Sequence, residues 1–417
     1  MFSLKRAAKS ILGPRLIGTT RAGLRALRDY PQYLLGHGIA ARLRILEFEI
    51  TYSCNARCQM CPLYAEHQNA DTHRFLARRK KEELSTSEIQ SVIEQCARLG
   101  TRSVIFSGGE PLLRQDLSEL IATVKRFGLS AGVITNGSAI SDQKARDIVT
   151  AGLDWLHVSI DGPGELHDSI RRVPNLFSRI ESNLEVLQGH RTRLGRTNPV
   201  VNLGCTVSAL NQHRLHELVP IAARWQALLI FRPVFFTIGP SNRAADAACP
   251  DLKPENWNLP ESVRNVDVEA LAEELQLVKR LAGRSGVAVS MEIETSIREL
   301  RERYYACSHF AHNKCFYPWF AARMNPYGDI YNCSLLNLMG NVREQPLKAI
   351  WNSSHYVAFR LSLRQHGLFP QCQRCCSLNP HDVIGRCLPR FSWVPAAAPR
   401  KDGLSASFRQ NGTRRNS

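Results

Sequence analysis

Apolar residues follow two alternating patterns between residues 45 and 234. Short runs rich in Val, Ile, Leu and Phe predict buried strands, and apolar positions three or four residues apart predict amphipathic helices between them. The predicted strands are Leu46–Tyr52, Ser103–Ser107, Ala131–Thr135, Trp155–Ile160, Val201–Val207 and Leu228–Val234. The predicted helices are 85–99, 116–127, 141–151 and 174–189. This alternation predicts an α/β fold with a parallel sheet, open or barrel-like.

The pattern changes in the second half of the chain. Residues 239–265 are rich in Pro, Asn and Ala and predict a long loop or lid. Helical spacing returns at 266–284 and 292–305, and the cysteine-rich part that follows shows little regular periodicity, so we expect metal to hold it together. The predicted organisation is a basic helical segment, a core barrel, a helical connection, a cysteine-rich domain and a disordered basic tail, at residues 1–44, 45–265, 266–305, 306–390 and 391–417.

The net charge of +17 belongs mainly to the chain ends. Residues 1–44 hold nine Lys or Arg against Asp29, and residues 391–417 hold five against Asp402. We therefore expect no nucleic-acid partner for the core. No apolar run approaches the roughly 20 residues of a membrane span, and no secretory signal precedes the first strand, which predicts a cytoplasmic protein. The basic N-terminal segment predicts either peripheral contact with an anionic membrane or a plain helical cap on the barrel.

The thirteen cysteines fall mainly into two groups. Cys54, Cys58 and Cys61 follow the first predicted strand with a C-x3-C-x2-C spacing. Three thiolates on one tight loop can hold three irons of a [4Fe–4S] cluster and leave the fourth iron open. A structural zinc site normally fills four positions, but core or zinc-binding cysteines remain an alternative. The second group lies in the last quarter of the chain, at Cys307, Cys315, Cys333, Cys372, Cys375, Cys376 and Cys387.

Glycine and polar residues stand at the ends of the next predicted strands, where barrel enzymes build their sites. Two adjacent glycines permit a close backbone approach to a ligand, and the Glu after them can accept a hydrogen bond from an ammonium group. These residues are Gly108, Gly109 and Glu110 after the second strand, Asn136 after the third, and Ser159 and Asp161 at the fourth, with Arg171 twelve residues beyond Ser159.

Together these motifs resemble the signature of the radical S-adenosylmethionine (SAM) superfamily. The resemblance implies a partial (β/α)6 barrel of TIM-like type, with a [4Fe–4S] cluster on Cys54, Cys58 and Cys61. It further implies that the Gly-Gly-Glu motif binds the SAM amino group, that Ser159 and Arg171 hold the SAM carboxylate, and that Asn136 and Asp161 belong to the same site. The residue before the third cysteine is usually aromatic in this family and is Met60 here.

The C-terminal cysteines resemble the SPASM/twitch extension of radical SAM enzymes. Cys315 and Cys333 are separated by twelve residues, a glycine and four more residues, and a C-x2-C pair follows at Cys372 and Cys375. The resemblance implies one auxiliary iron–sulfur cluster on these four cysteines, while structural zinc is the alternative. His381 stands where a full SPASM pattern has its next cysteine, so we expect the smaller twitch type. Two clusters stay open, with further ligands at Cys307 and Cys387.

The resemblance implies an enzyme that reductively cleaves SAM to a 5′-deoxyadenosyl radical, which takes a hydrogen atom from an organic substrate. The auxiliary cluster is then expected to transfer electrons or bind substrate, and flavodoxin or ferredoxin to supply the reducing electron. A small-molecule or lipid-linked substrate is favoured, because the N-terminal segment is short for a leader-recognition domain and Ser334 replaces the acid of sulfatase-maturing enzymes.

Alternatives to this reading are a peptide-modifying maturase, an iron–sulfur carrier and a nucleic-acid-binding module. Arg232 and His213, near the ends of later predicted strands, are candidate cavity-lining groups.

Overall fold

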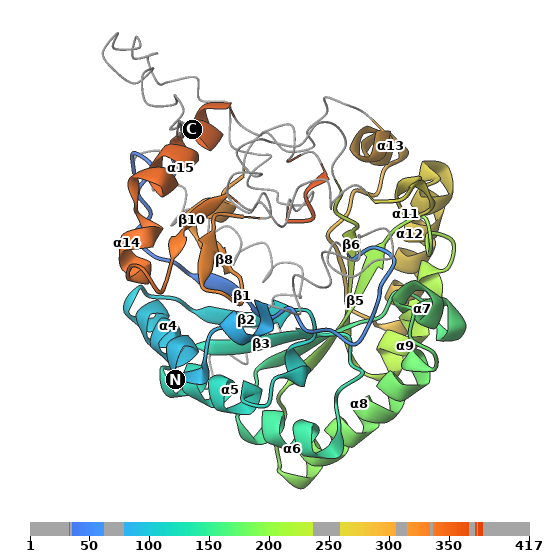
Figure 1. The fold of residues 1–417 in the computed structure, drawn as a ribbon. Coiled ribbons are helices and arrows are strands. Elements are labelled where there is room, and N and C mark those ends of the chain that lie inside the picture. The colour runs from blue at the N-terminus through green and yellow to red at the C-terminus, as the bar shows by residue number, and fades with distance from the viewer. Residues whose placement is uncertain are drawn as a thin grey trace, which may run out of the picture.

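The computed structural model describes residues 33, 36–61, 79–236, 259–305, 315–333, 337–366, 372 and 374–377. Within these residues the chain forms one sheet of ten strands, in the order β10-β9-β8-β1-β2-β3-β4-β5-β6-β7 (Figure 1). Every pairing within the run from β8 through β1 to β7 is parallel, and the sheet curves without closing. The expected partial barrel is therefore confirmed.

The predicted strands all form, and none of their ends differs from the prediction by more than one residue. Their bounds are β1 Ile45–Thr51, β2 Ser103–Gly108, β3 Ser130–Thr135, β4 Trp155–Ser159, β5 Val200–Val207 and β6 Leu228–Pro233. A short seventh strand, β7 at Val289–Met291, continues the parallel pairing beside β6. The four predicted helices also form, as α4 Thr86–Arg98, α5 Leu117–Arg126, α6 Asp142–Thr150 and α8 Leu176–Arg193.

Side chains alternate between two environments most clearly along β1. In β1, Leu46, Phe48 and Ile50 are buried, whereas Glu47 and Glu49 between them are partly exposed. The helices pack on the convex side of the sheet, where they cover the buried set (Figure 1). We call the opposite, concave side the inner face. Because successive side chains of a strand point to opposite sides, the inner face receives the polar set.

The pattern of apolar residues did not predict two of the helices. Helix α7 (Gly164–Arg171) buries only His167 and Ile170, too few apolar positions for a periodic signal. Helix α9 (Leu218–Arg224) contains Pro220 in its first turn, a position that tolerates proline although proline usually marks a loop.

Both helices that the sequence predicts between residues 266 and 305 form. Helix α12 spans Val268–Ser285, close to the prediction, and α13 begins at Ile297, five residues later than predicted, because the chain first forms β7. The predicted loop at 239–265 contains a short helix, α11 (Glu261–Arg264), in the part that is described. The expected N-terminal helices and C-terminal tail lie outside the described residues except for Tyr33 and residues 36–44.

Residues 317–366, where the sequence shows little regular periodicity, nevertheless form short strands and helices. Strand β8 (Ala321–Met324) pairs with β1, and β9 (Asp329–Tyr331) and β10 (Leu338–Asn341) follow as antiparallel strands. Helices α14 (Leu347–Trp351) and α15 (Ser354–His366) come next. Strands of three or four residues are too short to give a period-two signal.

The C-terminal module packs against the barrel through buried aromatic and charged side chains. Trp351 is 1% exposed and donates from Nε1 to the carbonyl of Ala40 at 2.9 Å. The fully buried Arg360 donates to the carbonyl of Gly38 at 3.1 Å. Arg343 pairs with Glu88, the capping-box residue of α4, at 2.6 Å. The sheet and these contacts make the two parts structurally continuous.

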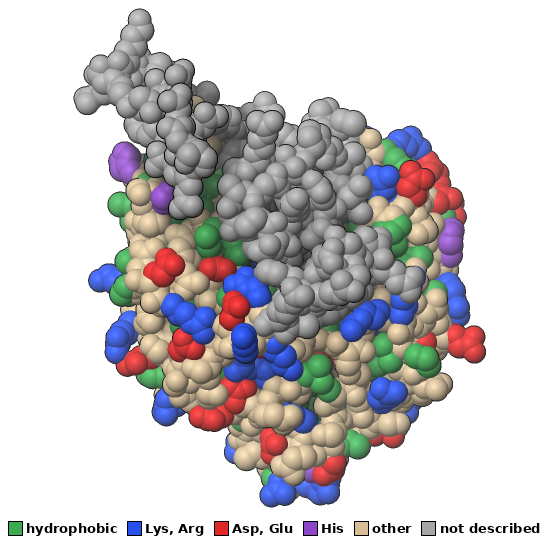
Figure 2. Space-filling model, in the orientation of Figure 1, with side chains coloured by type: hydrophobic (Ala, Val, Ile, Leu, Met, Phe, Trp, Pro, Cys, Tyr) green, Lys and Arg blue, Asp and Glu red, His purple; other side chains and the backbone are tan. Residues whose placement is uncertain are grey.

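The described surface is mixed in charge. Figure 2 shows Lys and Arg interspersed with Asp and Glu over the described part of one face. None of the helices in the described ranges combines the length and apolar content needed to span a membrane.

Candidate active site

The loop after β1 carries the first three cysteines. Cys58 is buried, and Cys54 and Cys61 are partly exposed. The backbone N–H groups of Arg57 and Gln59 donate to the carbonyls of Arg171 and Ile170, at 3.3 and 2.9 Å. The last carbonyls of a helix lack partners within the helix, so this loop caps the C-terminus of α7. The candidate cluster loop and Arg171 are therefore held together by the backbone.

The Gly-Gly-Glu motif lies against the same loop. The N–H groups of Gly109 and Glu110 donate to the carbonyls of Thr51 and Ser53, both at 2.8 Å. A Cβ atom on Gly109 would lie 2.3 Å from the Ser53 carbonyl oxygen, and one on Gly108, whose φ is +121°, would lie 2.3 Å from that of Thr51. The contact that requires glycine here is therefore with the chain just before Cys54. Approach to a ligand stays a prediction.

Glu110 is fully buried and ties β2 to β3. Its carboxylate accepts hydrogen bonds from Leu112 N at 3.0 Å, Thr135 Oγ1 at 2.7 Å and Asn136 N at 2.8 Å. Burial raises the pKa of Glu110, and these bonds oppose the rise. A carboxylate offers about four acceptor positions, so three protein donors leave one for an ammonium group.

Asn136 connects the end of β3 to the cysteine loop. Its Nδ2 donates to Oδ1 of Asn55 at 2.9 Å, and its Oδ1 accepts from the Ser138 hydroxyl at 2.6 Å. Asn55 in turn donates to Ser138 Oγ at 2.8 Å. Sequence reasoning missed Asn55 and Ser138, although Asn55 lies between the first two cysteines. The side chain of Asn136 thus positions the loop.

Asp161 and Arg171 form a buried ion pair beside Cys58. Asp161 accepts from Arg171 Nε at 2.6 Å and from the Thr206 N–H at 2.9 Å. Arg171 Nη1 lies 3.6 Å from Cys58 Sγ. Burial acts to lower the pKa of Arg171, but Asp161 and Cys58 outweigh it and the net change is upward. Arg171 is therefore a permanent cation at the cysteine loop, held in place by Asp161.

Ser159 stands at the end of β4 on the inner face. It pairs in register with Gly204 of β5. Its hydroxyl has no protein partner among the described residues, and the residue is partly exposed. A hydroxyl that keeps its hydrogen-bonding capacity at a strand end fits the predicted role as a ligand to the SAM carboxylate.

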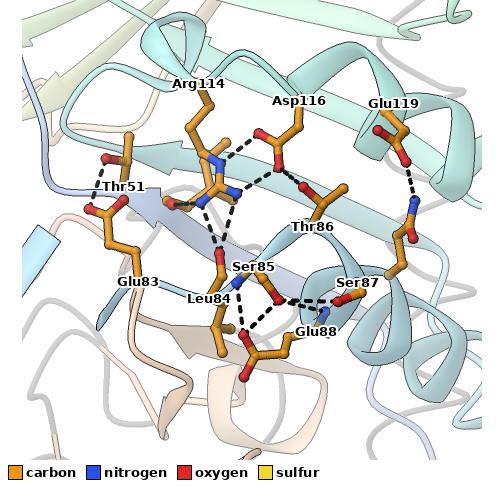
Figure 3. Close-up of polar contacts among 12 residues, drawn as sticks. Thr51, Glu83, Leu84, Ser85, Thr86, Ser87, Glu88, Arg114, Asp116 and Glu119 are labelled. Atoms are coloured by element: carbon orange, nitrogen blue, oxygen red, sulfur yellow. Dashed lines mark hydrogen bonds and ion pairs between the residues drawn. The ribbon is translucent and has the colours of Figure 1, made fainter. Parts of the chain in front are cut away.

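The polar support beneath the loop was also missed. Arg114 donates to the carbonyls of Ile50 and Leu84, at 3.0 and 3.2 Å, and forms two bonds with Asp116, at 2.9 and 2.7 Å (Figure 3). Glu83 accepts from the Thr51 hydroxyl at 2.9 Å. These contacts fix the C-terminal end of β1, from which the cysteine loop starts. The charged pair Arg114 and Asp116, just after Gly-Gly-Glu-Pro, was the sequence signal that could have indicated this support.

Two histidines near the ion pair are neutral. Burial lowers the pKa of His157 and of His167 to about 4. The His167 Nδ1 accepts from the Asp161 N–H at 3.1 Å, so its proton sits on Nε2. The His157 ring lies over Gly204, where any Cβ atom would clash with Nε2. A histidine within an apolar strand, in register beside a glycine-containing strand, was the available signal.

The structure also places the two groups that we considered as cavity-lining. Arg232 lies at the end of β6, with a side chain that is 46% exposed and paired with Glu292. His213 is exposed on the loop after β5, next to Gln212. Only Arg232 is in a position to face the sheet's inner side.

The C-terminal cysteines gather near one another. The thiols of Cys315, Cys372 and Cys375 interact electrostatically, and Cys375 N donates to the Cys372 carbonyl at 3.1 Å. Cys333 lies beside Tyr317, whose backbone N–H donates to the Cys315 thiol. All four predicted ligands are thus in one region. Cys307, His381 and Cys387 lie outside the described residues.

The donor chemistry of both cysteine groups fits iron–sulfur clusters. Burial raises the pKa of Cys54 to about 11 and that of Cys375 to about 12, so these thiols ionise only when a cation such as a metal compensates. Soft thiolate ligands select iron–sulfur clusters or zinc. In the described ranges, no three His, Cys, Asp or Glu side chains converge on a single-ion site. In a cluster each thiolate binds a different iron, so convergence on one point is not required.

Comparisons with known proteins agree with this chemistry. A family model for the radical SAM superfamily matches residues 48–204, and a model for an iron–sulfur cluster-binding domain, SPASM, matches residues 315–376. An AdoMet-dependent heme synthase of Oleidesulfovibrio alaskensis is 26% identical over 367 residues, which cover 83% of each chain. A PqqA peptide cyclase of Xanthomonas oryzae pv. oryzae is 25% identical, over 75% of each chain.

Two solved structures share the fold. SuiB of Streptococcus suis superposes with a TM-score of 0.56 at 13% identity, covering 85% of this chain and 76% of SuiB. The structure of anSMEcpe with bound AdoMet gives 0.53 at 16% identity, covering 80% and 86%. With two cysteine groups that fit clusters, the chain belongs to the radical SAM superfamily of enzymes, with a [4Fe–4S] cluster and SAM as cofactors and a C-terminal SPASM-type iron–sulfur domain.

Proposed function

We propose that this enzyme performs radical chemistry on a small organic molecule, with Cys54, Cys58 and Cys61 holding the SAM-binding cluster. When bound, that cluster and SAM supply a 5′-deoxyadenosyl radical, which removes a hydrogen atom from an unreactive C–H bond of the substrate. The observation that carries the proposal is the interlocking of the cysteine loop with Arg171, Asp161 and the ends of β2 and β3.

The residues of the chain divide the work of binding SAM. Ser159 and Arg171 bind the SAM carboxylate, since one hydroxyl and one fixed cation lie on the same edge of the sheet. Glu110 and the backbone of Gly108 and Gly109 receive the amino group through the remaining acceptor positions. Asp161 and Asn136 position this site, because their side chains bind Arg171 and the cysteine loop.

Cys315, Cys333, Cys372 and Cys375 bind one auxiliary cluster in this proposal. The Cys376 thiol, next to Cys375, interacts electrostatically with Arg232 at the end of β6, which supports a role in electron transfer to or from the substrate, or in substrate binding. An external one-electron donor such as flavodoxin or ferredoxin reduces the enzyme.

Two classes of substrate have support from the relatives. The heme synthase of Oleidesulfovibrio alaskensis matches 83% of both chains and supports a small-molecule substrate. The PqqA peptide cyclase matches 75% of both chains at a similar identity and supports a peptide. We favour the small molecule, since the longer match belongs to the heme synthase. Docking of residues 1–44 on a membrane, which would bring a lipid-linked substrate, stays a prediction.

The experiment is a substrate comparison. Anaerobically reconstituted protein is mixed with SAM and dithionite, and 5′-deoxyadenosine is measured with a porphyrin, with a PqqA-type peptide or with neither. The porphyrin is coproporphyrin III, chosen from the name of the Fe-coproporphyrin III synthase of Methanosarcina barkeri, which is 31% identical to this chain over 151 residues. The proposal expects the small molecule to raise the yield above the unsupplemented reaction. An increase with the peptide alone would replace the small-molecule proposal with the peptide-modifying function.

A further inference from the structure

Arg232 is an exposed cation on a strand of the core sheet. It is the fifth residue of β6, and its side chain is 46% exposed although β6 is paired on both sides, with β5 and β7. The main-chain N–H of Glu292 donates to the Phe231 carbonyl at 2.8 Å, which fixes the Glu292 side chain beside Arg232. Exposure of a charged side chain at the C-terminal end of a barrel strand is typical of a ligand-binding position.

Among the described residues, only part of the Arg232 guanidinium has a partner. Its Nε donates to Glu292. Its Nη1 and Nη2 atoms have no hydrogen-bond partner among the described residues. A guanidinium whose Nε is occupied keeps its terminal pair of N–H groups, and that pair matches the two oxygens of a carboxylate.

The strand register places Arg232 on the same face as the proposed SAM site. Ser159 pairs with Gly204, and Arg232 pairs with Thr206, two residues further along β5. Since alternate residues of a strand share a face, Ser159 and Arg232 both lie on the inner face, two strands apart and roughly 12 Å from each other. The neutral His157 of β4 interacts electrostatically with both Arg232 and Arg171.

The C-terminal cysteine segment also comes within electrostatic range of Arg232. The Cys376 thiol, next to the proposed cluster ligand Cys375, interacts electrostatically with Arg232 on β6 and with Arg323 on β8. Strand β8 begins the run of parallel strands and β6 lies next to its last strand, so the two are far apart in the order of the sheet (Figure 1). Arg323 is already paired with Glu47 and Glu49 of β1. Of these two arginines, Arg232 is the one whose Nη atoms have no hydrogen-bond partner among the described residues.

We propose that Arg232 binds a carboxylate group of the substrate on the inner face, between the SAM site and the auxiliary cysteines. The inference rests on the proposed function and names the chemical class of its substrate. A carboxylate anchored there holds the rest of the molecule between the site of radical formation and the auxiliary cluster. Glu292 orients Arg232 through Nε and leaves the Nη edge for the substrate.

Binding is measured on reconstituted protein with SAM and without reductant. Coproporphyrin III, which carries four carboxylates, is titrated against its tetramethyl ester with wild type, Arg232→Gln and Arg232→Lys. Arg224→Gln is the matched control, because Arg224 is 53% exposed and also paired with glutamates, on a helix away from the inner face. A capped peptide with one Glu, against its Gln counterpart, tests a peptide as the source of the carboxylate.

We expect Arg232→Gln to weaken binding of the porphyrin acid about tenfold or more, with no change for the ester or in Arg224→Gln. Arg232→Lys should restore only part of the affinity, since a lysine lacks the paired donors. A dependence on Arg232 with the Glu peptide alone assigns the anchor to a peptide carboxylate. Equal affinity of wild type and Arg232→Gln for every acid, or no preference of wild type for acid over neutral probe, overturns the inference. Formation of 5′-deoxyadenosine by the same preparations tests the radical chemistry separately.

Discussion

Arg171 donates from Nε to Oδ2 of Asp161 at 2.6 Å, and this ion pair sets the position of a cation beside the cysteine loop. Asp161 is fully buried and receives a second bond from the Thr206 N–H, so it has little freedom to move. The arrangement makes Asp161 a positioning residue for Arg171, and its place in the SAM site, which the resemblance implies, stays a prediction.

Replacing Asp161 with Asn should weaken SAM binding about 10–100-fold, because a neutral amide holds Arg171 less firmly. Iron content should stay close to wild type, since the cysteines are unchanged. Equilibrium dialysis with labelled SAM gives the affinity. Asp142→Asn is the control, because Asp142 pairs with His190 on the surface. An unchanged SAM affinity in Asp161→Asn would show that the ion pair does not serve the SAM site.

Gly109→Ala should displace the cysteine loop. The new Cβ atom would lie 2.3 Å from the Ser53 carbonyl oxygen, a backbone atom one residue before Cys54. We expect a loss of bound iron and a lower thermal unfolding midpoint. Gly283→Ala in α12 is the matched control, because nothing lies within 4 Å of its Cβ position, and it should stabilise the helix by about 0.5–1 kcal/mol. Normal iron loading in Gly109→Ala would contradict the role given to this contact.

The cysteine spacing and the strand ends could be predicted because both depend on local sequence. Cys54, Cys58 and Cys61 sit on one loop, and the six core strands carry short runs rich in apolar residues. The partners of the motif residues depend on long-range packing. Glu110 accepts hydrogen bonds from Thr135 and Asn136, and Arg114 donates to the end of β1. Both contacts follow from how strands meet at one edge of the sheet.

The short strands β8 to β10 could not be predicted for a related reason. Strand β8 is stabilised by pairing with β1, nearly three hundred residues earlier, and β9 and β10 are paired in turn onto β8. Three or four residues carry no periodic signal of their own. The motif for the C-terminal domain was visible only as cysteine and glycine spacing.

Glu110→Gln should cost about 1–3 kcal/mol of unfolding free energy. The amide replaces one of two acceptor oxygens with a donor, although three protein donors point at this side chain. Urea denaturation of the metal-free protein measures the change. Glu119→Gln serves for comparison, since Glu119 accepts one exposed hydrogen bond from Gln90. Equal stability of both variants would argue against the buried network as described.

Stability should fall as the pH drops from 6.5 towards 4, in part because of His167. The unfolded chain binds a proton with the ordinary pKa of 6.5, whereas burial, with Arg171 adding to it, lowers the folded pKa to about 4 despite Asp161 and Asp168. The unfolded state therefore binds more protons in this window, so stability is complete above pH 6.5 and decreases below it. The shift corresponds to roughly 3 kcal/mol.

His167→Asn tests this titration, because the Asn oxygen can accept from the Asp161 N–H but does not ionise near neutral pH. Its free energy of unfolding, measured from pH 7 to 4.5, should depend less on pH than that of wild type. Exposed His355→Asn should keep the wild-type slope. His157, whose pKa is also lowered to about 4 by burial, accounts for part of the slope that remains. An unchanged slope in His167→Asn would place the titration elsewhere.

The central claim is that SAM is cleaved at the cysteine loop after β1. The most direct measurement is 5′-deoxyadenosine formation after anaerobic reconstitution and reduction in the presence of SAM, with wild type, Cys58→Ala and Cys96→Ala compared. Cys96 is fully buried on α4 and serves as the cysteine control. We predict about eight irons per wild-type chain, and deoxyadenosine from wild type and Cys96→Ala but not from Cys58→Ala. Wild-type yields from Cys58→Ala, or none from fully loaded wild type with any substrate tested, would contradict the account.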